Sequence, residues 1–199
     1  MSTSGAEAVA AVSDESTRHI EEIQFDLGEG PGRDAFAAGR PVLTSDLGAA
    51  FRTWPAYAAA VRVLGVGSAH AFPLQLGASR FGVMTFYGER PHSLDHRELT
   101  YCLDVAEAAT EALLDRRSPG SDERAPPRVS TSLRFRTEVY QAQGMVMVDL
   151  GIGLADALAR MRAHAYSTDV DLDALALEII AGRTRLDRLD PTDDRGPST

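Results

Sequence analysis

The sequence predicts an α+β domain followed by a small all-α bundle, and three observations lead to this division. Two β-rich runs, at 69–76 and 81–87, flank the turn residues Gly77-Ala78-Ser79-Arg80, which is typical of an antiparallel hairpin. Helical patterns lie on both sides of the hairpin, and their order favours a sheet with helices on one side. From Ser132 to Leu186 the apolar spacing is purely helical.

Shifts in composition divide the chain into five parts. Residues 1–13 form a small, polar tail or, over Ala8–Val12, an edge strand, and residues 14–117 form the α+β domain. The segment 118–131 has no apolar period and is rich in Pro, Gly and charge, as flexible linkers are. Residues 132–188 form the helical bundle, and residues 189–199 a disordered tail.

The composition is that of a globular protein without a membrane segment. Of the 199 residues 44% are hydrophobic and 25% charged, and no apolar run approaches the roughly 18 residues of a membrane span. The N-terminus lacks the pattern of a signal peptide. A single cysteine, Cys102, excludes an internal disulfide and fits a reducing cytosol, so we expect a cytoplasmic protein. The net charge of −9 disfavours non-specific association with nucleic acid.

Local signals place the elements of the first domain. Residues 41–44 predict a short strand, and residues 57–64 predict a helix that ends at Gly65, a position suited to a left-handed C-cap. Asp95 and Glu98 have the spacing of a capping box. The helix that follows is expected to bury one stripe, made of Leu99, Cys102, Leu103, Ala106, Ala109 and Leu113.

No set of residues predicts an enzyme. The glycine-rich segment 28–32 is not expected to bind phosphate, because Pro31 removes a donor, Glu29 repels anions and no lysine follows. It predicts a turn that opens a helix over 33–38. Cys102 falls on the apolar face of a helix, where a thiol acts as a small hydrophobe.

The histidines do not predict a metal site. His92 and His96 have a spacing that can suit zinc, but the capping box places His92 ahead of its helix and no further ligands complete a set. His70 lies in a predicted strand and is expected to line the core or a pocket. Haem remains open as a cofactor there, and the sequence names no other.

Aromatic residues of the first domain allow two interpretations. Trp54 and Tyr57 could line an apolar small-molecule pocket, together with His70 and Phe72. Alternatively, the two aromatics anchor their loop onto the core, and we favour this because aromatic side chains are usually buried.

The bundle is predicted as three helices, over residues 133–148, 154–166 and about 172–183, with Gly182 as the last stop signal. Their inward positions are expected to include Val139, Ala142 and Val146 in the first helix, Leu154, Ala157, Leu158, Met161 and Ala165 in the second, and Leu172, Leu175, Ala176, Ile179 and Ile180 in the third. Gly144 within a helix costs about 1 kcal/mol relative to Ala. That cost suggests the close approach of a neighbouring helix, which we favour slightly, or of an RNA.

The first domain resembles the GAF domain of actinobacterial GAF–ANTAR regulators. The matching segments are 24–31 (Gln-Phe-Asp-Leu-Gly-Glu-Gly-Pro), 46–55, 65–68, 72–74 and 81–84. Where the family usually has a cysteine after Gly-Glu-Gly-Pro, this chain has Gly32. The resemblance also implies a leading helix and strand ahead of Val12, so either the true start lies upstream or the sheet is truncated by one strand.

The second part resembles the ANTAR module. The family's Ala-Lys-Gly in the first helix corresponds to Ala142-Gln143-Gly144, its Leu-Arg pair to Met161-Arg162, and its Leu…Ala pair to Leu172 and Ala176. ANTAR modules bind the loops of paired RNA hairpins and prevent a terminator from forming, and GAF partners sense signals or dimerise. The resemblance therefore implies a homodimeric, RNA-binding transcription antitermination regulator, with a possible small-molecule ligand in the GAF-like domain.

Candidate RNA contacts follow one side of the first helix. Arg136, Tyr140, Gln143 and Met147 fall on one stripe, which offers a guanidinium, a stacking ring and an amide. Gly144 lies beside the stripe, and Arg160 and Arg162 can add phosphate contacts. Against RNA binding, Gln143 replaces the usual lysine, and Asp169, Asp171 and Asp173 crowd the third helix. The alternative is a ligand-sensing or protein-interaction module whose bundle no longer binds RNA.

Overall fold

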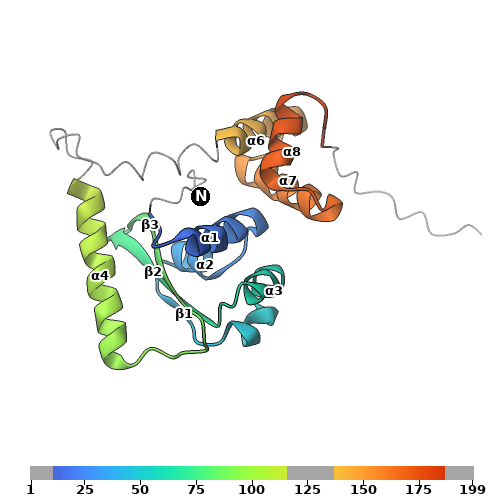
Figure 1. The fold of residues 1–199 in the computed structure, drawn as a ribbon. Coiled ribbons are helices and arrows are strands. Elements are labelled where there is room, and N and C mark those ends of the chain that lie inside the picture. Colours follow the sequence, from blue (N-terminus) through green and yellow to red (C-terminus); the bar gives the residue numbers. More distant parts are fainter. Residues whose placement is uncertain (1–10, 116–136, 187–199) are drawn as a thin grey trace, which may run out of the picture. The chain divides into compact units, whose positions relative to one another are not determined.

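In a computed structural model of the chain, the structure describes residues 11–115 and 137–186, which form two compact units that are considered separately (Figure 1). The predicted edge strand at 8–12 lies almost wholly outside these residues. The same holds for the predicted linker and C-terminal tail, and for the start of the first bundle helix.

The first unit contains an antiparallel sheet of three strands in the order β1-β2-β3. The strands are β1 (Val42–Thr44), β2 (Ser68–Leu76) and β3 (Ser79–Gly88). The predicted short strand and hairpin are confirmed. The turn is tighter than predicted, because Leu76 already pairs with Ser79 and only Gly77 and Ala78 remain between the strands. A register shift between Leu74 and Gln75 marks a bulge near the turn.

Helices cover both faces of the sheet (Figure 1). Alternate side chains of β2 point to opposite faces. Ala69 packs into the cluster formed with α1 (Glu15–Leu27), η1 (Leu47–Arg52) and α3 (Pro55–Val63). Phe72 and Leu74 pack against α4 (His96–Asp115). The expectation of helices on one side is therefore wrong, since β2 is apolar on both of its faces.

Local hydrogen bonds define where α4 begins. The Asp95 amide donates to Glu98 Oε2 at 2.8 Å, and the Glu98 amide donates to Asp95 Oδ1 at 2.9 Å. This reciprocal pair satisfies two amides that the helix itself leaves without acceptors, so the predicted capping box is confirmed. Gly65, after α3, adopts the left-handed conformation with φ of 79°.

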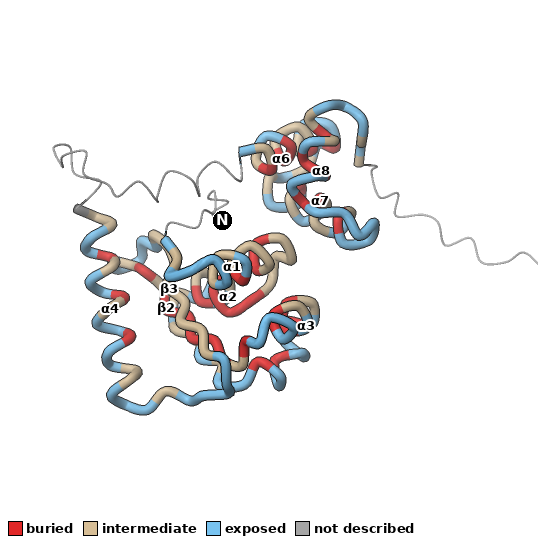
Figure 2. Tube along the Cα trace, viewed as in Figure 1, coloured by how far each residue is buried: buried red, intermediate tan, exposed pale blue. Residues whose placement is uncertain are grey.

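One position on α4 was assigned to the wrong side. Cys102 and Ala106 are buried against the sheet, whereas Leu103 is 45% exposed. Leu103 follows Cys102 by one residue, which turns its side chain by about 100° from the buried stripe. Thr110 lies on the buried side instead and bonds back to the Ala106 carbonyl. Figure 2 shows the buried positions of α4 on the side toward the sheet.

The second unit consists of α6 (Thr137–Leu150), α7 (Leu154–Thr168) and α8 (Leu172–Ile180). As predicted, one side of each helix faces the core of this unit. The buried residues are Val139, Ala142 and Val146 in α6, Ala157, Met161 and Ala165 in α7, and Leu172, Leu175, Ala176 and Ile179 in α8. Leu154, Leu158 and Ile180 are only half-buried. Helix α8 ends at Ile180, and Gly182 follows in the left-handed region.

Within the described ranges, no single helix is long and apolar enough to cross a membrane. The pair α6 and α7 meets the length and composition test only when both helices are taken together, across a bend of 105°.

Candidate functional site

The turn after α1 is held by side chains rather than left open for a ligand. The Gly32 amide donates to Gln24 Oε1 at 2.8 Å, and the Tyr57 amide donates to Glu29 Oε1 at 2.7 Å. Gly28 closes α1 in the left-handed conformation, and its own amide bonds to carbonyls of that helix. The Gly28 and Gly32 amides and the Glu29 carboxylate of this segment are therefore already bonded within the protein rather than directed at a phosphate. This agrees with the interpretation of the segment as a turn.

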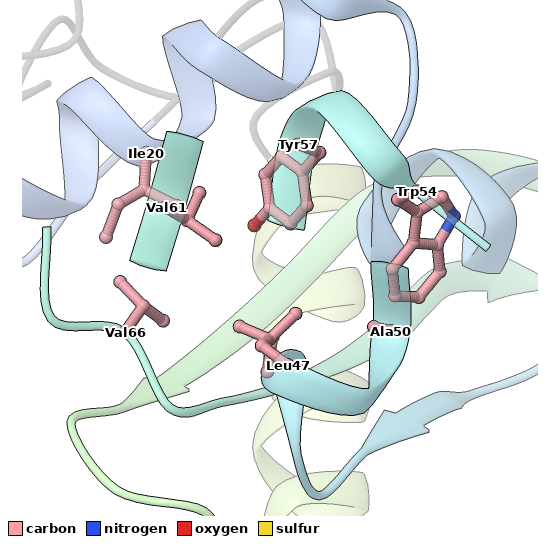
Figure 3. Close-up of a cluster of buried hydrophobic side chains, with 8 residues drawn as sticks. Ile20, Leu47, Ala50, Trp54, Tyr57, Val61 and Val66 are labelled. Atoms are coloured by element: carbon pink, nitrogen blue, oxygen red, sulfur yellow. The ribbon is translucent and has the colours of Figure 1, made fainter. Parts of the chain in front are cut away.

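Trp54 and Tyr57 lie together in the core beneath α1. Their rings form an edge-to-face pair with centroids 6.4 Å apart, and Tyr57 is fully buried (Figure 3). The Trp54 indole donates to Asp34 Oδ2 at 3.1 Å, which ties its loop to α2 (Pro31–Ala38). Figure 3 shows Tyr57 between Trp54 and the aliphatic side chains of Ile20, Val61 and Val66. This packing supports the anchoring role that the sequence favoured.

A line of polar side chains continues from Tyr57 toward α1. The Tyr87 hydroxyl donates to Glu21 Oε1 at 2.8 Å, and Gln24 Nε2 donates to Glu21 Oε2 at 2.9 Å. The Tyr57 hydroxyl lies near that of Tyr87, at a geometry that falls short of a hydrogen bond, and is left without a partner. Burial raises the pKa of both tyrosines, and the charge of Glu21 adds to this for each. Both hydroxyls are therefore neutral at physiological pH.

His70 and Phe72 lie on the other face of the sheet. Phe72 packs edge-to-face on Phe86, with ring centroids 5.7 Å apart, and belongs to the cluster under α4. His70 pairs with Phe86 in the register between β2 and β3, which gives it the same orientation as Phe72. The four residues predicted to share a pocket are thus divided by the sheet, Trp54 and Tyr57 on one face and His70 and Phe72 on the other.

His70 connects β2 to the segment that precedes α4. Its Nε2 lies 3.1 Å from the His92 carbonyl, so this nitrogen must hold the proton and donate, because a carbonyl only accepts. Nδ1 is then a buried acceptor without a partner. Burial is the main cause that lowers the pKa of His70, against the opposing effect of the bond to His92. Ser68 makes a similar connection, from its hydroxyl to the Arg90 carbonyl at 3.0 Å.

His92, one of the two histidines whose spacing could suit zinc, faces a carboxylate. His92 Nε2 lies 2.9 Å from Glu98 Oε2, and both side chains are about half exposed. In the part of the chain that the structure describes, no three His, Cys, Asp or Glu side chains converge on a common point. Cys102 is buried, and burial raises its pKa, which disfavours the reactive thiolate.

In the second unit, Gln143 does not face outward with the predicted RNA contacts. It is 2% exposed, and its Nε2 donates to the Leu154 carbonyl at 2.7 Å. The physical reason is helical spacing: Val139, Gln143, Val146 and Leu150 recur at i, i+4, i+7 and i+11, so Gln143 belongs to the core stripe of α6. Its amide satisfies a carbonyl in the first turn of α7, where it holds two helices together.

Gly144 takes the surface position that Gln143 was expected to hold. A Cβ added to Gly144 would meet no atom within 4 Å outside its own helix backbone and chain neighbours. The predicted close packing of a neighbouring helix is therefore wrong within the described residues. Tyr140, Gly144 and Met147 are all half-buried and recur at i, i+4 and i+7, so they form one strip, here called the Gly144 strip.

Of the three arginines proposed to contact phosphate, Arg136, Arg160 and Arg162, the structure describes only the last two. Arg160 and Arg162 are half-buried on α7, and each has an interaction with another group. Arg183 is held by Glu178, with both bonds at 2.7 Å. Residues 137–186 contain four arginines and seven acidic residues, so the described bundle has a net charge of −3.

A small pocket lies elsewhere on the bundle. Its volume is about 160 Å³, and Met145, Asp149, Ile179 and Arg185 are among its lining residues. Small-molecule sites usually occupy about 300–1,000 Å³, so this pocket is too small to be the preferred ligand site.

Sequence reasoning missed the polar line of Glu21, Gln24 and Tyr87. A signal was present, because Glu21 and Gln24 follow Ile20 on the side of α1 that faces the sheet. Their partner Tyr87 lies 66 residues from Glu21 along the chain, and only the fold brings the two together.

Comparison with known proteins identifies the first unit. Residues 2–114 match the family model described as a GAF domain. Such a domain indicates a ligand-sensing or dimerisation module. Among curated proteins, none matches the sequence.

Tyr57 and Tyr87 should respond differently to loss of the hydroxyl. Tyr87→Phe removes a donor from the Glu21 carboxylate and should lower the free energy of unfolding by about 1–2 kcal/mol. Tyr57→Phe removes a buried hydroxyl without a partner, so stability should stay within about 0.5 kcal/mol or rise. Urea denaturation followed by tryptophan fluorescence measures both, and equal losses would contradict this assignment.

Stability should decrease below neutral pH in a manner that depends on His70. Because the pKa of His70 is lowered in the folded state, the unfolded chain binds a proton first as the pH falls below about 6.5. The stability that the neutral His70 side chain contributes is fully present above that pH and is lost as the pH falls below it. In His70→Gln, the loss of unfolding free energy between pH 7.5 and pH 5.5 should be smaller than in the unmodified chain. Equal losses would show that His70 is not responsible.

Proposed function

Because the chain belongs to the GAF domain family, we propose that it is a transcription regulator in which the GAF domain senses a signal or joins two copies, and in which the bundle binds the loops of paired RNA hairpins and prevents termination. In this proposal the effector spans residues 132–188 and the segment 118–131 links it to the GAF domain.

The observation on which the RNA-binding part rests is the open glycine of α6. A glycine in the interior of a helix costs about 1 kcal/mol relative to alanine. At Gly144 no packing against the described residues explains that cost, since a Cβ added there would meet none of their atoms within 4 Å outside its own helix backbone and chain neighbours. The glycine leaves bare helix backbone between Tyr140 and Met147, against which a base or a sugar–phosphate chain can lie closely.

The side chains that flank Gly144 suit single-stranded loops. Tyr140 offers a ring on which an unpaired base can stack, and base–aromatic stacking is worth about 1–3 kcal/mol. Met147 offers an apolar, adaptable contact one turn further along. Arg136, four residues before Tyr140 in the sequence, would supply a cation to the phosphates.

The net negative charge of the described part of the bundle constrains the mechanism. With a net charge of −3 over its described residues, one bundle can neutralise few phosphates, so its affinity for one loop should be low. Two bundles joined by their GAF domains would bind a pair of hairpins with an effective concentration that raises the overall affinity. The sensing step would then control whether both bundles are presented together.

A second function is favoured by the acidic character of α8. Asp171 is its N-cap, Asp173 lies in its first turn and Asp169 precedes both. Gln143 is buried and so is unavailable as a surface contact. On these grounds the alternative is a bundle that binds a protein partner and no RNA, downstream of the same sensing or dimerisation module.

Gly144→Ala separates these functions because it should affect stability and binding in opposite directions. The alanine should raise the free energy of unfolding by about 0.5–1 kcal/mol, since the site is open and helical. It should also weaken binding to a two-hairpin RNA at least about tenfold, because the added methyl group, with no protein atom nearby, stands where the RNA would approach.

Gln141→Ala is the matched control, since it also places an alanine on α6 but at an exposed position off the Gly144 strip. Its RNA affinity should be nearly unchanged. If Gly144→Ala binds RNA as well as the unmodified chain, the strip is not the contact. If the unmodified chain binds the two-hairpin RNA no better than a scrambled RNA at low salt, the protein-binding alternative replaces the proposal.

A further inference from the structure

We propose that the C-terminal ends of η1 and α3 form a docking surface for a short acidic segment of another protein, one that also carries apolar side chains. The surface consists of Phe51, Arg52, Arg62, Val63 and Leu64, here called the α3 patch. It belongs to the GAF domain, and the inference does not depend on whether the bundle binds RNA.

The first observation is that the α3 patch combines exposed apolar side chains with arginine. Phe51 is 37% exposed, Val63 86% and Leu64 38%. Arg52 and Arg62 are exposed as well. The residues are contiguous, because the Arg62 guanidinium lies over the Phe51 ring, 6.0 Å from its centroid, and the others follow these two in the chain. Apolar patches rimmed by polar side chains often mark sites of interaction.

The second observation is the local charge. Residues 40–67 contain three arginines and one acid, Asp46, so this segment has a net charge of +2 in a chain of net charge −9. Asp46 is engaged at the start of η1, where its Oδ1 accepts from the Gly48 amide at 2.8 Å. Within residues 11–115, neither Arg52 nor Arg62 forms an ion pair. Both cations of the α3 patch therefore lack a carboxylate in this part of the chain.

The third observation is that Arg62 is already restrained. Its contact with the Phe51 ring limits the movement of the guanidinium, so less conformational entropy is lost when the group binds an anion. Arginine presents its N–H groups as a planar fork that fits the two oxygens of a carboxylate. Arg52, next to Phe51 in the chain, supplies a second cation for the same acidic segment.

Other anionic partners fit the α3 patch less well. Basic segments that bind anionic membranes usually contain about four to eight cations, whereas the patch has two. RNA phosphates would pair with both arginines, but they offer no apolar surface against which Val63 and Leu64 can be buried. An acidic protein segment with apolar side chains satisfies both the charged and the apolar parts of the patch.

Two matched double variants of the full chain test the proposal. Arg62→Gln with Val63→Ser removes one cation and one exposed apolar side chain from the α3 patch. Arg97→Gln with Leu103→Ser makes the equivalent changes on α4, which packs on the other face of the sheet. Because all four side chains are exposed, both variants should fold, and urea denaturation checks that they do.

The probe is a labelled synthetic peptide in which single leucines alternate with pairs of glutamates. In a titration at low salt, the unmodified chain and the α4 variant should bind it equally, and the α3 variant at least about tenfold more weakly. Binding should weaken as salt is added, because the ion pairs are exposed. A peptide with lysine in place of glutamate should not bind.

Three results would overturn the proposal. One is that the unmodified chain does not bind the glutamate peptide, and another is that both double variants lose affinity equally. The third is that phosphatidylserine vesicles or oligouridine bind the α3 patch more tightly than the peptide does, since the partner would then be a membrane or a nucleic acid.

Discussion

Burial of β2 on both faces is the constraint on which the GAF domain depends. Six of its nine residues are buried, and they include side chains directed to each face. Helices must therefore pack on both sides of the sheet, and they do so with two separate clusters, one centred on Tyr57 and one on Phe72. The two buried polar residues of this strand, Ser68 and His70, each donate a hydrogen bond to a carbonyl of the segment before α4, which fixes that segment to the strand.

The same constraint explains the exposure of β3. Among the three strands that the structure describes, β2 is the interior one, and the helices that cover it cover its neighbour β3 less completely. A GAF domain that joins two copies would present the attached bundles in pairs. Under the proposed function, such pairing would compensate for the net negative charge of each described bundle, because two weak RNA contacts would act together.

Local signals were sufficient to predict the parts of the fold that depend on neighbouring residues. The capping box of Asp95 and Glu98 and the hairpin around Gly77 were predicted because their determinants lie within a few residues of each other. The spacing of apolar residues located the buried side of each helix but did not decide which residues at its border face inward. Leu103 and Gln143 were each assigned to the wrong side of a helix, since adjacent positions differ by about 100° and residue type was a poor guide to which is inward. Trp54 and Tyr57 lie on one face of the sheet, and His70 and Phe72 on the other. This division depends on strand register, which sequence spacing alone does not fix.

The number of chains bound to one RNA tests the account most directly. Sedimentation velocity with a labelled two-hairpin RNA and with a matched single-hairpin RNA gives both the stoichiometry and the affinity. The account predicts two chains on the two-hairpin RNA and at least about tenfold weaker binding to the single hairpin, because the second contact is intramolecular. One chain per RNA, with equal affinity for the two RNAs, would contradict it.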